Sequence, residues 1–330
     1  MSARGWRLTA GIVALAVLIA LPLWVRDTYY VNIASQILLF AVFALALNVM
    51  VGYAGLVSLG HAGLFAIAGY ACALLLQAGY PHSLAIAGAI AAGLIAAAMF
   101  GVLALRASGI GFLMITLALG QIIWGIAYRW VGLTQGDNGV KVSSRPQPFG
   151  FSLASAPAFY YTTLIVFLLA IAAMAMLMRS PFGASLRGAR DQPRRMNALG
   201  YNVWLIRLVA FLFSGFWSAV AGLLFVYYNN FISPQAATLQ GSAEVLLMVI
   251  SGGSGTLLGP VAGAVIVAIT KTIVSSWIAR WNLVLGLIFV AIISFMPEGL
   301  VPGSARLWRS GLKLLRARGA APAKLAEPQP

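Results

Sequence analysis

The residues of this chain that could do chemistry are few, and most of them are neutral polar groups set within apolar runs. They are Asn48, Ser58, His61, Thr116, Gln121 and Glu244. Amides, hydroxyls and an imidazole can bind a polar solute through hydrogen bonds. The imidazole of His61 could equally be satisfied by a backbone carbonyl. An acid inside a membrane is costly and usually functional, although Glu244 could instead cap a helix that starts near Gly241-Ser242.

Motifs of catalysis and of cofactor binding are absent from the sequence. The chain has six acidic residues and two histidines, and it contains neither H-E-x-x-H nor a G-x-S-x-G elbow with a plausible triad. Its one cysteine, Cys72, lies within an apolar run, so the chain can form neither an internal disulfide nor a thiolate metal site. It also lacks G-x-x-x-x-G-K-[ST] and cannot bind ATP through a P-loop. We therefore expect no catalytic residues, no metal ligands and no bound cofactor.

Two glycine-rich stretches share one spacing, 200 residues apart. Gly52, Gly55 and Gly63 recur as Gly252, Gly255 and Gly263. Interrupted helices occur in membranes where they are buried in protein or line a cavity, whereas small residues also allow close helix packing. The first alternative predicts helices broken by glycine in two related, parallel halves. The translocation path would then be lined by Asn48, Gly52, Gly55, Ser58, His61, Thr116, Gln121, Glu244, Gly252 and Gly255.

A basic segment, Arg179 to Gly200, separates two long apolar runs. Its four central arginines would cost about 10–14 kcal/mol inside a bilayer, so the segment must lie outside it. Ser180-Pro181 predicts a helix start, Pro193 predicts a break followed by a second short helix, and Gly200 predicts its end. If the helix were merely kinked, helical spacing would place six residues on one face. They are Arg187, Arg190, Asp191, Arg194, Arg195 and Ala198.

The composition shows what must position these residues. The chain has 330 residues, of which 62% are hydrophobic and 8% charged, and its mean hydropathy is +0.95. Soluble domains carry roughly 25% charged residues, so we expect an all-α polytopic membrane protein with about ten membrane segments. The net charge of +15 comes from basic residues in the gaps between apolar runs. The positive-inside rule and anionic lipid explain this pattern better than nucleic acid does.

The alternation of runs and gaps predicts the organisation of the chain. Residues 1–298 would form one transmembrane domain, with a cytoplasmic segment at 179–202 and an external loop at 133–158. Residues 299–330 would form a basic cytoplasmic tail whose end is too polar to fold. The first arginines, the basic segment and the tail fall on the same side, so both termini would be cytoplasmic. The basic segment would then either only fix this topology or dock a cytosolic partner.

Five motifs resemble those of a known family and occur in its order. They are G-Y-A-G-L-V-S-L-G-H-A-G-L-F-A-I-A-G-Y from Gly52, G-I-G-F-L-M-I-T-L-A-L from Gly109 with Gln121, T-Q-G-D-N-G from Thr134, S-P-F-G from Ser180 through Arg187, Arg190 and Ala198-Leu-Gly200 to Ala210-Phe, and S-G-G-S-G-T-L-L-G-P from Ser251. Together they resemble the LivM-type permeases of branched-chain amino acid ABC importers.

This resemblance implies a function and a set of partners. The chain would be a permease subunit in a bacterial inner (plasma) membrane, working with a LivH-like second permease, two cytosolic ABC ATPases that bind the ATP, and a periplasmic or external solute-binding protein. Residues Arg187 to Gly200 would be the ATPase-coupling segment, although Pro193-Arg194-Arg195-Met196 departs from the acidic and alanine residues usual there. Relatives carry urea, short amides or aromatic acids, so the solute stays open. The alternative is an ion-coupled secondary transporter acting alone, for which Glu244 is the candidate ion site.

Overall fold

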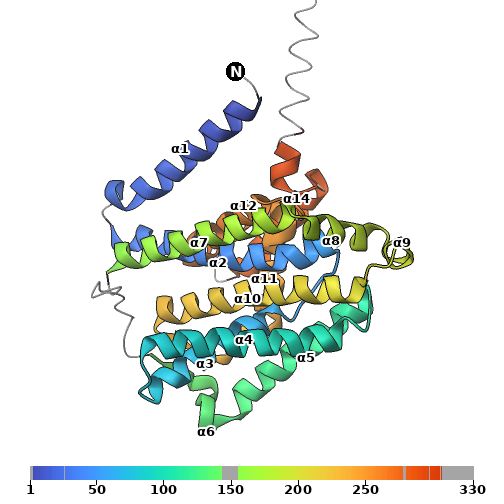
Figure 1. Cartoon of the computed structure of the whole chain (residues 1–330). Helices are drawn as coiled ribbons and strands as arrows, with labels where there is room; N and C mark the ends of the chain where they lie inside the picture. Colours follow the sequence, from blue (N-terminus) through green and yellow to red (C-terminus); the bar gives the residue numbers. More distant parts are fainter. Residues whose placement is uncertain are drawn as a thin grey trace, which may run out of the picture.

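Long apolar helices make up most of the structure (Figure 1), a computed structural model that describes residues 3–25, 27–142, 155–277, 280–296, 298–304 and 306. In this part of the chain six helices are long and apolar enough to cross a membrane, which takes about 20 residues. They are α2 (Thr28–Asn48) with its extension η1 (Val49–Ala54), α4 (His82–Ala104), α5 (Ile110–Arg129), α7 (Ala156–Arg179), α10 (Val203–Asn229), and α12 (Gly259–Ile269) continued by η5 (Thr270–Val274) and α13 (Ser275–Trp277). The chain is therefore a mostly helical polytopic membrane protein. The composition predicts this class, although two short strands depart from the all-α expectation.

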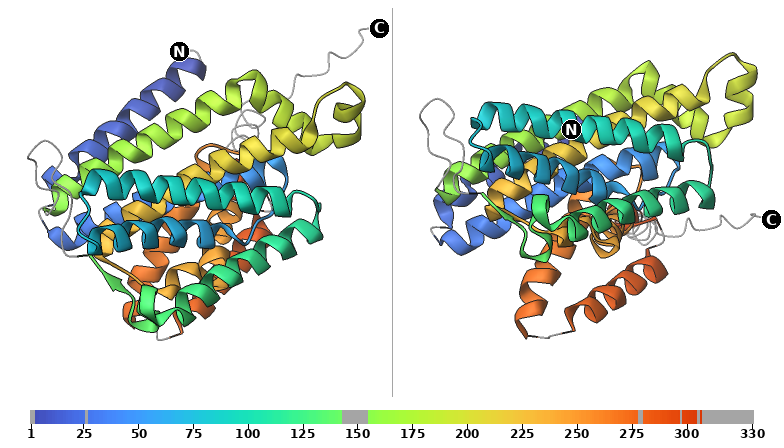
Figure 2. Two further views of the ribbon diagram at one scale, coloured as in Figure 1. Left: turned by 60° about the horizontal axis from the view of Figure 1, so that its bottom comes forward. Right: turned by 90° about the horizontal axis from the view of Figure 1, so that it is seen from below.

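Four further helices have shorter apolar spans. They are α1 (Ala3–Trp24), α3 (His61–Gln77), α11 (Leu239–Gly252) and α14 (Trp281–Phe295). The helix α14 stands on the flank of the bundle (Figure 2), and Leu283, Leu287 and Val290 are exposed along it. A soluble protein rarely exposes such a patch, and here lipid or another subunit would cover it. The count of about ten membrane segments stays a prediction.

The helices α2 and α10 form the centre of the bundle. Every residue from Ala41 to Met50 is buried, whereas α4, α5 and α7 each bury only part of their surface. Exposed side chains such as Ile122 and Leu169 cover the outer faces of these three helices. A helix that is apolar all round belongs in a core, and one with exposed apolar residues faces lipid.

The two ends of the bundle carry different structures. At one end, the short helices α8 (Pro181–Asp191) and α9 (Pro193–Ala198) connect α7 to α10, and we refer to this as the α8–α9 end. At the other end lie α6 (Val131–Thr134), η2 (Gly136–Asn138), η4 (Pro234–Ala237) and two strands, β1 (Val140–Lys141) and β2 (Phe231–Ile232). The antiparallel pair β1–β2 joins the loop after α5 to the connection after α10, and we refer to this as the β1–β2 end.

Gly139 lets this pair of strands form. Its φ is +66°, and a Cβ there would lie 2.4 Å from the carbonyl oxygen of Ile232. Of the expected external loop, residues 133–142 contain the end of α6, the turn η2 and the strand β1, and residues 156–158 already belong to α7. Residues 143–154 of that loop, and all of the expected tail beyond residue 306, lie outside the described residues.

Candidate functional site

The local structure of the basic segment is the one predicted from its sequence. The Ser180 hydroxyl accepts a hydrogen bond from the Gly183 amide at 3.3 Å, and Pro181 is the first helical residue of α8. The helix breaks at Gln192, and Pro193 begins α9. Gly200 ends α9 with φ +87°. Its amide bonds to the Asn197 carbonyl and the next amide bonds to that of Met196, the paired bonds of a Schellman motif.

The common face expected for this segment does not form, because the helix breaks instead of bending. Arg187 donates to the Met178 carbonyl at 3.0 Å, and Arg190 donates to the Gly52 carbonyl, so both turn back toward the membrane helices. Arg194, Arg195 and Ala198 lie beyond the break on α9 and are exposed, as Arg187 and Arg190 also are in part. Asp191 is also exposed, with its carboxylate 3.7 Å from the Arg190 Nε atom, and such a surface pair stabilises little.

The bond from Arg190 reaches the end of the central helix. The extension η1 ends at Gly55, which has φ +70°, and carbonyls at a helix C-terminus carry partial negative charge and lack helical partners. A guanidinium is well suited to satisfy them. A Cβ on Gly55 would lie 2.8 Å from the Arg190 Cγ atom. The glycine therefore gives the arginine stem room to approach the helix end.

The two glycine-rich stretches meet at this point. The Asn48 side chain is buried at 2% exposure; its Oδ1 atom accepts from the Gly255 amide at 2.9 Å and its Nδ2 atom donates to the Thr256 carbonyl at 2.8 Å. A Cβ on Gly52 would lie 2.2 Å from the Gly255 nitrogen. Gly252 instead packs within its own stretch, where a Cβ would lie 1.8 Å from the Gly259 carbonyl oxygen. The glycines permit backbone contact between the two stretches, and Asn48 holds that contact.

Three of the polar residues expected on a path are instead bonded within the bundle. Both nitrogens of the buried His61 lie 2.8 Å from hydroxyls, Nδ1 from Ser58 and Nε2 from Ser214. Because the Ser214 hydroxyl donates to the Ala46 carbonyl, it accepts from Nε2–H, and in a neutral imidazole Nδ1 then accepts from the Ser58 hydroxyl. The hydroxyl of Thr116, also buried, accepts from the Leu59 amide at 3.2 Å and donates to the Leu113 carbonyl.

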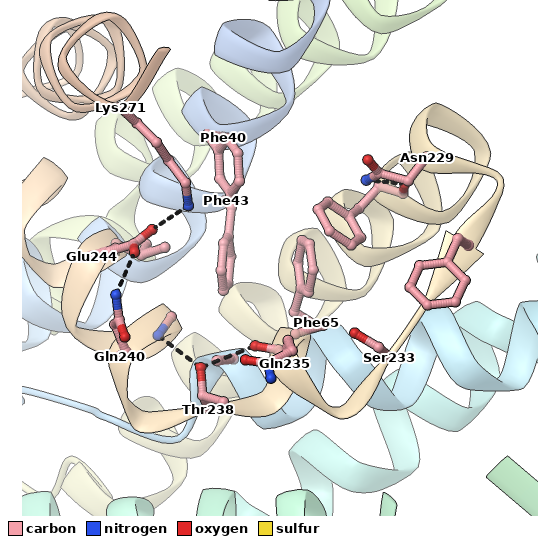
Figure 3. Close-up of a pocket in the computed structure, with 16 residues that line it drawn as sticks. Phe40, Phe43, Phe65, Asn229, Ser233, Gln235, Thr238, Gln240, Glu244 and Lys271 are labelled. Atoms are coloured by element: carbon pink, nitrogen blue, oxygen red, sulfur yellow. Dashed lines mark hydrogen bonds and ion pairs between the residues drawn. The ribbon is translucent and has the colours of Figure 1, made fainter. Parts of the chain in front are cut away.

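A cavity of about 390 Å³ opens between α2, α3, α10 and α11, on the side of the β1–β2 end (Figure 3). Its walls are aromatic and its rim is polar. The aromatic residues are Phe40, Phe43, Phe65, Phe225 and Phe231, and the polar ones include Asn229, Ser233, Gln235, Thr238 and Gln240. Glu244 and Lys271 lie on one side of it, with their charged atoms 3.1 Å apart. The volume falls within the range of small-ligand sites.

The structure corrects one alternative for Glu244. The helix α11 begins at Leu239, and the Thr238 hydroxyl caps it by accepting from the Gly241 amide. Glu244 lies in the second turn and pairs with Lys271, so it is not a cap. Of the ten expected path residues, all within the described part of the chain, it alone lines the cavity. Gln121 is half-buried on α5, away from the cavity.

The helical bundle and the cavity together define a class of protein. A bundle of lipid-facing helices, with a polar and aromatic cavity toward one end and a basic helical pair at the other, is the build of a membrane permease. The family model described as "Branched-chain amino acid transport system / permease component" matches residues 29–293. The chain belongs to this family. It is a multi-pass inner membrane protein and a permease subunit of an ABC importer, not a catalytic enzyme.

Individual relatives agree with this membership. The chain is 30% identical to the high-affinity branched-chain amino acid transport system permease protein LivM of Escherichia coli K12, over 88% of this chain and 74% of that protein. It is 28% identical to LivM of Salmonella typhimurium, over 82% and 70%. It is also 31% identical to the autoinducer 2 import system permease protein LsrC of Escherichia coli O9:H4, over 67% and 66%. No solved structure matches the chain.

Proposed function

We propose that this chain is one of two permease subunits of an importer for branched-chain amino acids or related small solutes. Its partners would be a LivH-like second permease, two cytosolic ABC ATPases and an external solute-binding protein. ATP would bind to the ATPases, and this chain would contribute neither an ATPase site nor a cofactor. The solute class is that named in two of its relatives, and the third relative imports a different solute.

The proposed topology has ten segments, with both termini and the α8–α9 end in the cytoplasm. The four shorter apolar helices would also enter the membrane. Two of them would belong to glycine-broken pairs: α3, which begins after Gly60, and α11, which ends at Gly252. Arginines gather on cytoplasmic segments, and the α8–α9 segment contains Arg187, Arg190, Arg194 and Arg195. Residues 1–298 would be the permease domain and 299–330 a cytoplasmic tail.

The α8–α9 segment would couple the ATPases to the path. The exposed α9 residues Arg194, Arg195 and Ala198 would contact an ATPase, and Gly200 would set the exit of the chain from that contact. Arg190 would carry the motion to Gly52. Asn48 would carry it on to Gly255, because its two hydrogen bonds tie the broken ends of α2 and α11 together.

The observation that carries this proposal is the hydrogen bond from Arg190 to the Gly52 carbonyl. The two residues are 138 positions apart in sequence, and the bond joins the cytoplasmic segment to the break in the central helix. A displacement of α8 must either drag that break or lose a charge-assisted hydrogen bond, which contributes roughly 1.5–3 kcal/mol. An ATP-dependent movement of α8 can therefore bias the break between two states.

The test is to remove the guanidinium and keep the rest of the segment. We expect Arg190→Gln to lower ATP-driven uptake about tenfold at equal membrane abundance, with ATP hydrolysis no longer stimulated by solute-loaded binding protein. Arg106→Gln is the matched control, because Arg106 is exposed in the turn between α4 and α5 and its side chain bonds to no other described residue. Stimulated hydrolysis that survives in Arg190→Gln would remove Arg190 from the coupling route.

The alternative of an ion-coupled transporter acting alone is tested on the same preparation. Family membership argues against it. In proteoliposomes, uptake should require the ATPases and ATP and should persist when an uncoupler collapses the proton gradient. Uptake by this chain without companion subunits would contradict the proposal.

A further inference from the structure

The cavity toward the β1–β2 end combines an apolar wall with one pair of opposite charges. Phenylalanines from α2 and α3 face the space, and Glu244 from α11 and Lys271 from η5 lie at one side of it (Figure 3). The Glu244 Oε2 atom lies 3.1 Å from the Lys271 Nζ atom, and its Oε1 atom accepts from the Gln240 amide at 3.4 Å. Both charged groups therefore reach the same side of one cavity.

This ion pair is placed where it contributes little to stability. The Glu244 side chain is 12% exposed and that of Lys271 is 39% exposed. Ion pairs that water still reaches contribute little to stability, because water screens the attraction and both long side chains must be held in one geometry. Paired charges within membrane segments usually mark a solute path. The pair is therefore suited to bind a ligand that carries one positive and one negative charge.

We propose that this cavity binds an aliphatic α-amino acid as its zwitterion, with the ammonium group on Glu244, the carboxylate on Lys271 and the side chain against Phe40, Phe43 and Phe65. This inference deepens the proposed function and rests on it. When the zwitterion enters, the Glu244–Lys271 contact is replaced by two contacts between opposite charges, and the phenyl rings remove the aliphatic side chain from water.

The same arrangement discriminates against solutes with fewer charges. A neutral solute such as urea or acetamide cannot replace the ion pair, whereas an amine could pair only with Glu244 and a carboxylate only with Lys271. Each of these solutes makes one of the two charged contacts that the zwitterion makes, and should bind more weakly. The cavity therefore selects for two opposite charges on adjacent groups as well as for an apolar side chain.

A cysteine at the cavity mouth can report this selection. Gln235 is the residue to replace, because it is exposed and lines the cavity. The chain's one native cysteine, Cys72, is buried and should not react. In the purified complex without ATP, L-leucine should slow maleimide labelling of Gln235→Cys. Equal concentrations of 3-methylbutylamine, which lacks the carboxylate, of 4-methylpentanoate, which lacks the ammonium group, and of urea should not. Ala78→Cys, exposed at the same end but outside the cavity, should be labelled at one rate throughout.

The two charges are then removed one at a time in the reporter chain. Glu244→Gln and Lys271→Met should each raise the half-protecting concentration of L-leucine at least tenfold, the loss expected for one charged hydrogen bond. Glu298→Gln removes a far more exposed ion pair, with Arg306, and should change nothing.

Two results would overturn the proposal. One is equal protection by L-leucine and by the amine, the acid or urea. The other is unchanged protection by L-leucine in both Glu244→Gln and Lys271→Met. The comparison of the four solutes needs only Gln235→Cys. It can therefore still be made if Glu244→Gln or Lys271→Met fails to fold. Labelling is measured without ATP and therefore does not depend on the coupling proposal. If uptake proved independent of ATP while L-leucine still protected the cysteine, the coupling proposal would fail and this one would stand.

Discussion

The contact between the two glycine-rich stretches should depend on Asn48. In Asn48→Leu the Gly255 amide and the Thr256 carbonyl both lose a partner inside the bundle. The wild-type bonds are 2.9 and 2.8 Å long and the side chain is 2% exposed, so little water can replace them. A buried polar group without a partner costs about 1–3 kcal/mol, and two of them cost roughly 2–6 kcal/mol.

The assay compares two substitutions on the same helix. Ser35 is buried on α2 and its hydroxyl bonds only to the Val31 carbonyl one turn earlier, so Ser35→Ala removes a bond within the helix and strands no distant group. Chemical unfolding of the purified complex in detergent should show a loss of roughly 2–6 kcal/mol for Asn48→Leu and under about 1 kcal/mol for Ser35→Ala. ATP-driven uptake should fall sharply in Asn48→Leu alone.

Asn48→Asp tests the side chain as a donor. The ionised carboxylate would still accept from the Gly255 amide but would leave the Thr256 carbonyl without a donor, so the loss of stability should exceed those of Ser35→Ala and Asn48→Leu. The protonated group can donate its O–H to that carbonyl, so the loss should then be smaller than that of Asn48→Leu. An Asn48→Leu protein with wild-type unfolding free energy and wild-type uptake would refute the reasoning.

Three further predictions follow from single positions. Gly52→Ala should destabilise the protein by about 1–3 kcal/mol, because its Cβ would meet the Gly255 nitrogen at 2.2 Å, whereas Gly125→Ala on α5, with nothing within 4 Å, should not destabilise it; thermal unfolding of both variants decides. Gly200→Ala has open space but φ +87°, so it should cost about 1–2 kcal/mol of local strain, leaving assembly normal and lowering only solute-stimulated ATP hydrolysis. His61→Phe removes the partner of two hydroxyls and should cost roughly 1–3 kcal/mol per stranded group in the same unfolding assay; equal stability would mean that the imidazole is not structural.

Features set by neighbouring residues were predictable from the sequence. The two short helices at 180–200 follow from a serine cap, two prolines and a terminal glycine, each of which acts within one turn. The membrane class follows from composition, which needs no partner residue. The resemblance also identified the family that the comparisons show.

Features that join distant positions were not predictable. Both Asn48 and Gly255 were candidates, but nothing in one sequence reports that they bond across 207 positions. The break at Gln192 was predictable from Pro193, and it removes the common face that a merely kinked helix would have formed, but the bond from Arg190 to Gly52 was not predictable. The cavity was missed because its phenylalanines look like any other residues of an apolar run, and only the fold gathers them around Glu244.

The short ribbon β1–β2 connects the loop after α5 with the wall of the cavity. One of its strands belongs to the loop after α5, and the other contains Phe231, which forms part of the cavity wall. A protein that docks on that loop can therefore shift Phe231 without touching it. Docking of the solute-loaded binding protein on the loop and rearrangement of the cavity wall would then be coupled through the two residue pairs of the β1–β2 ribbon.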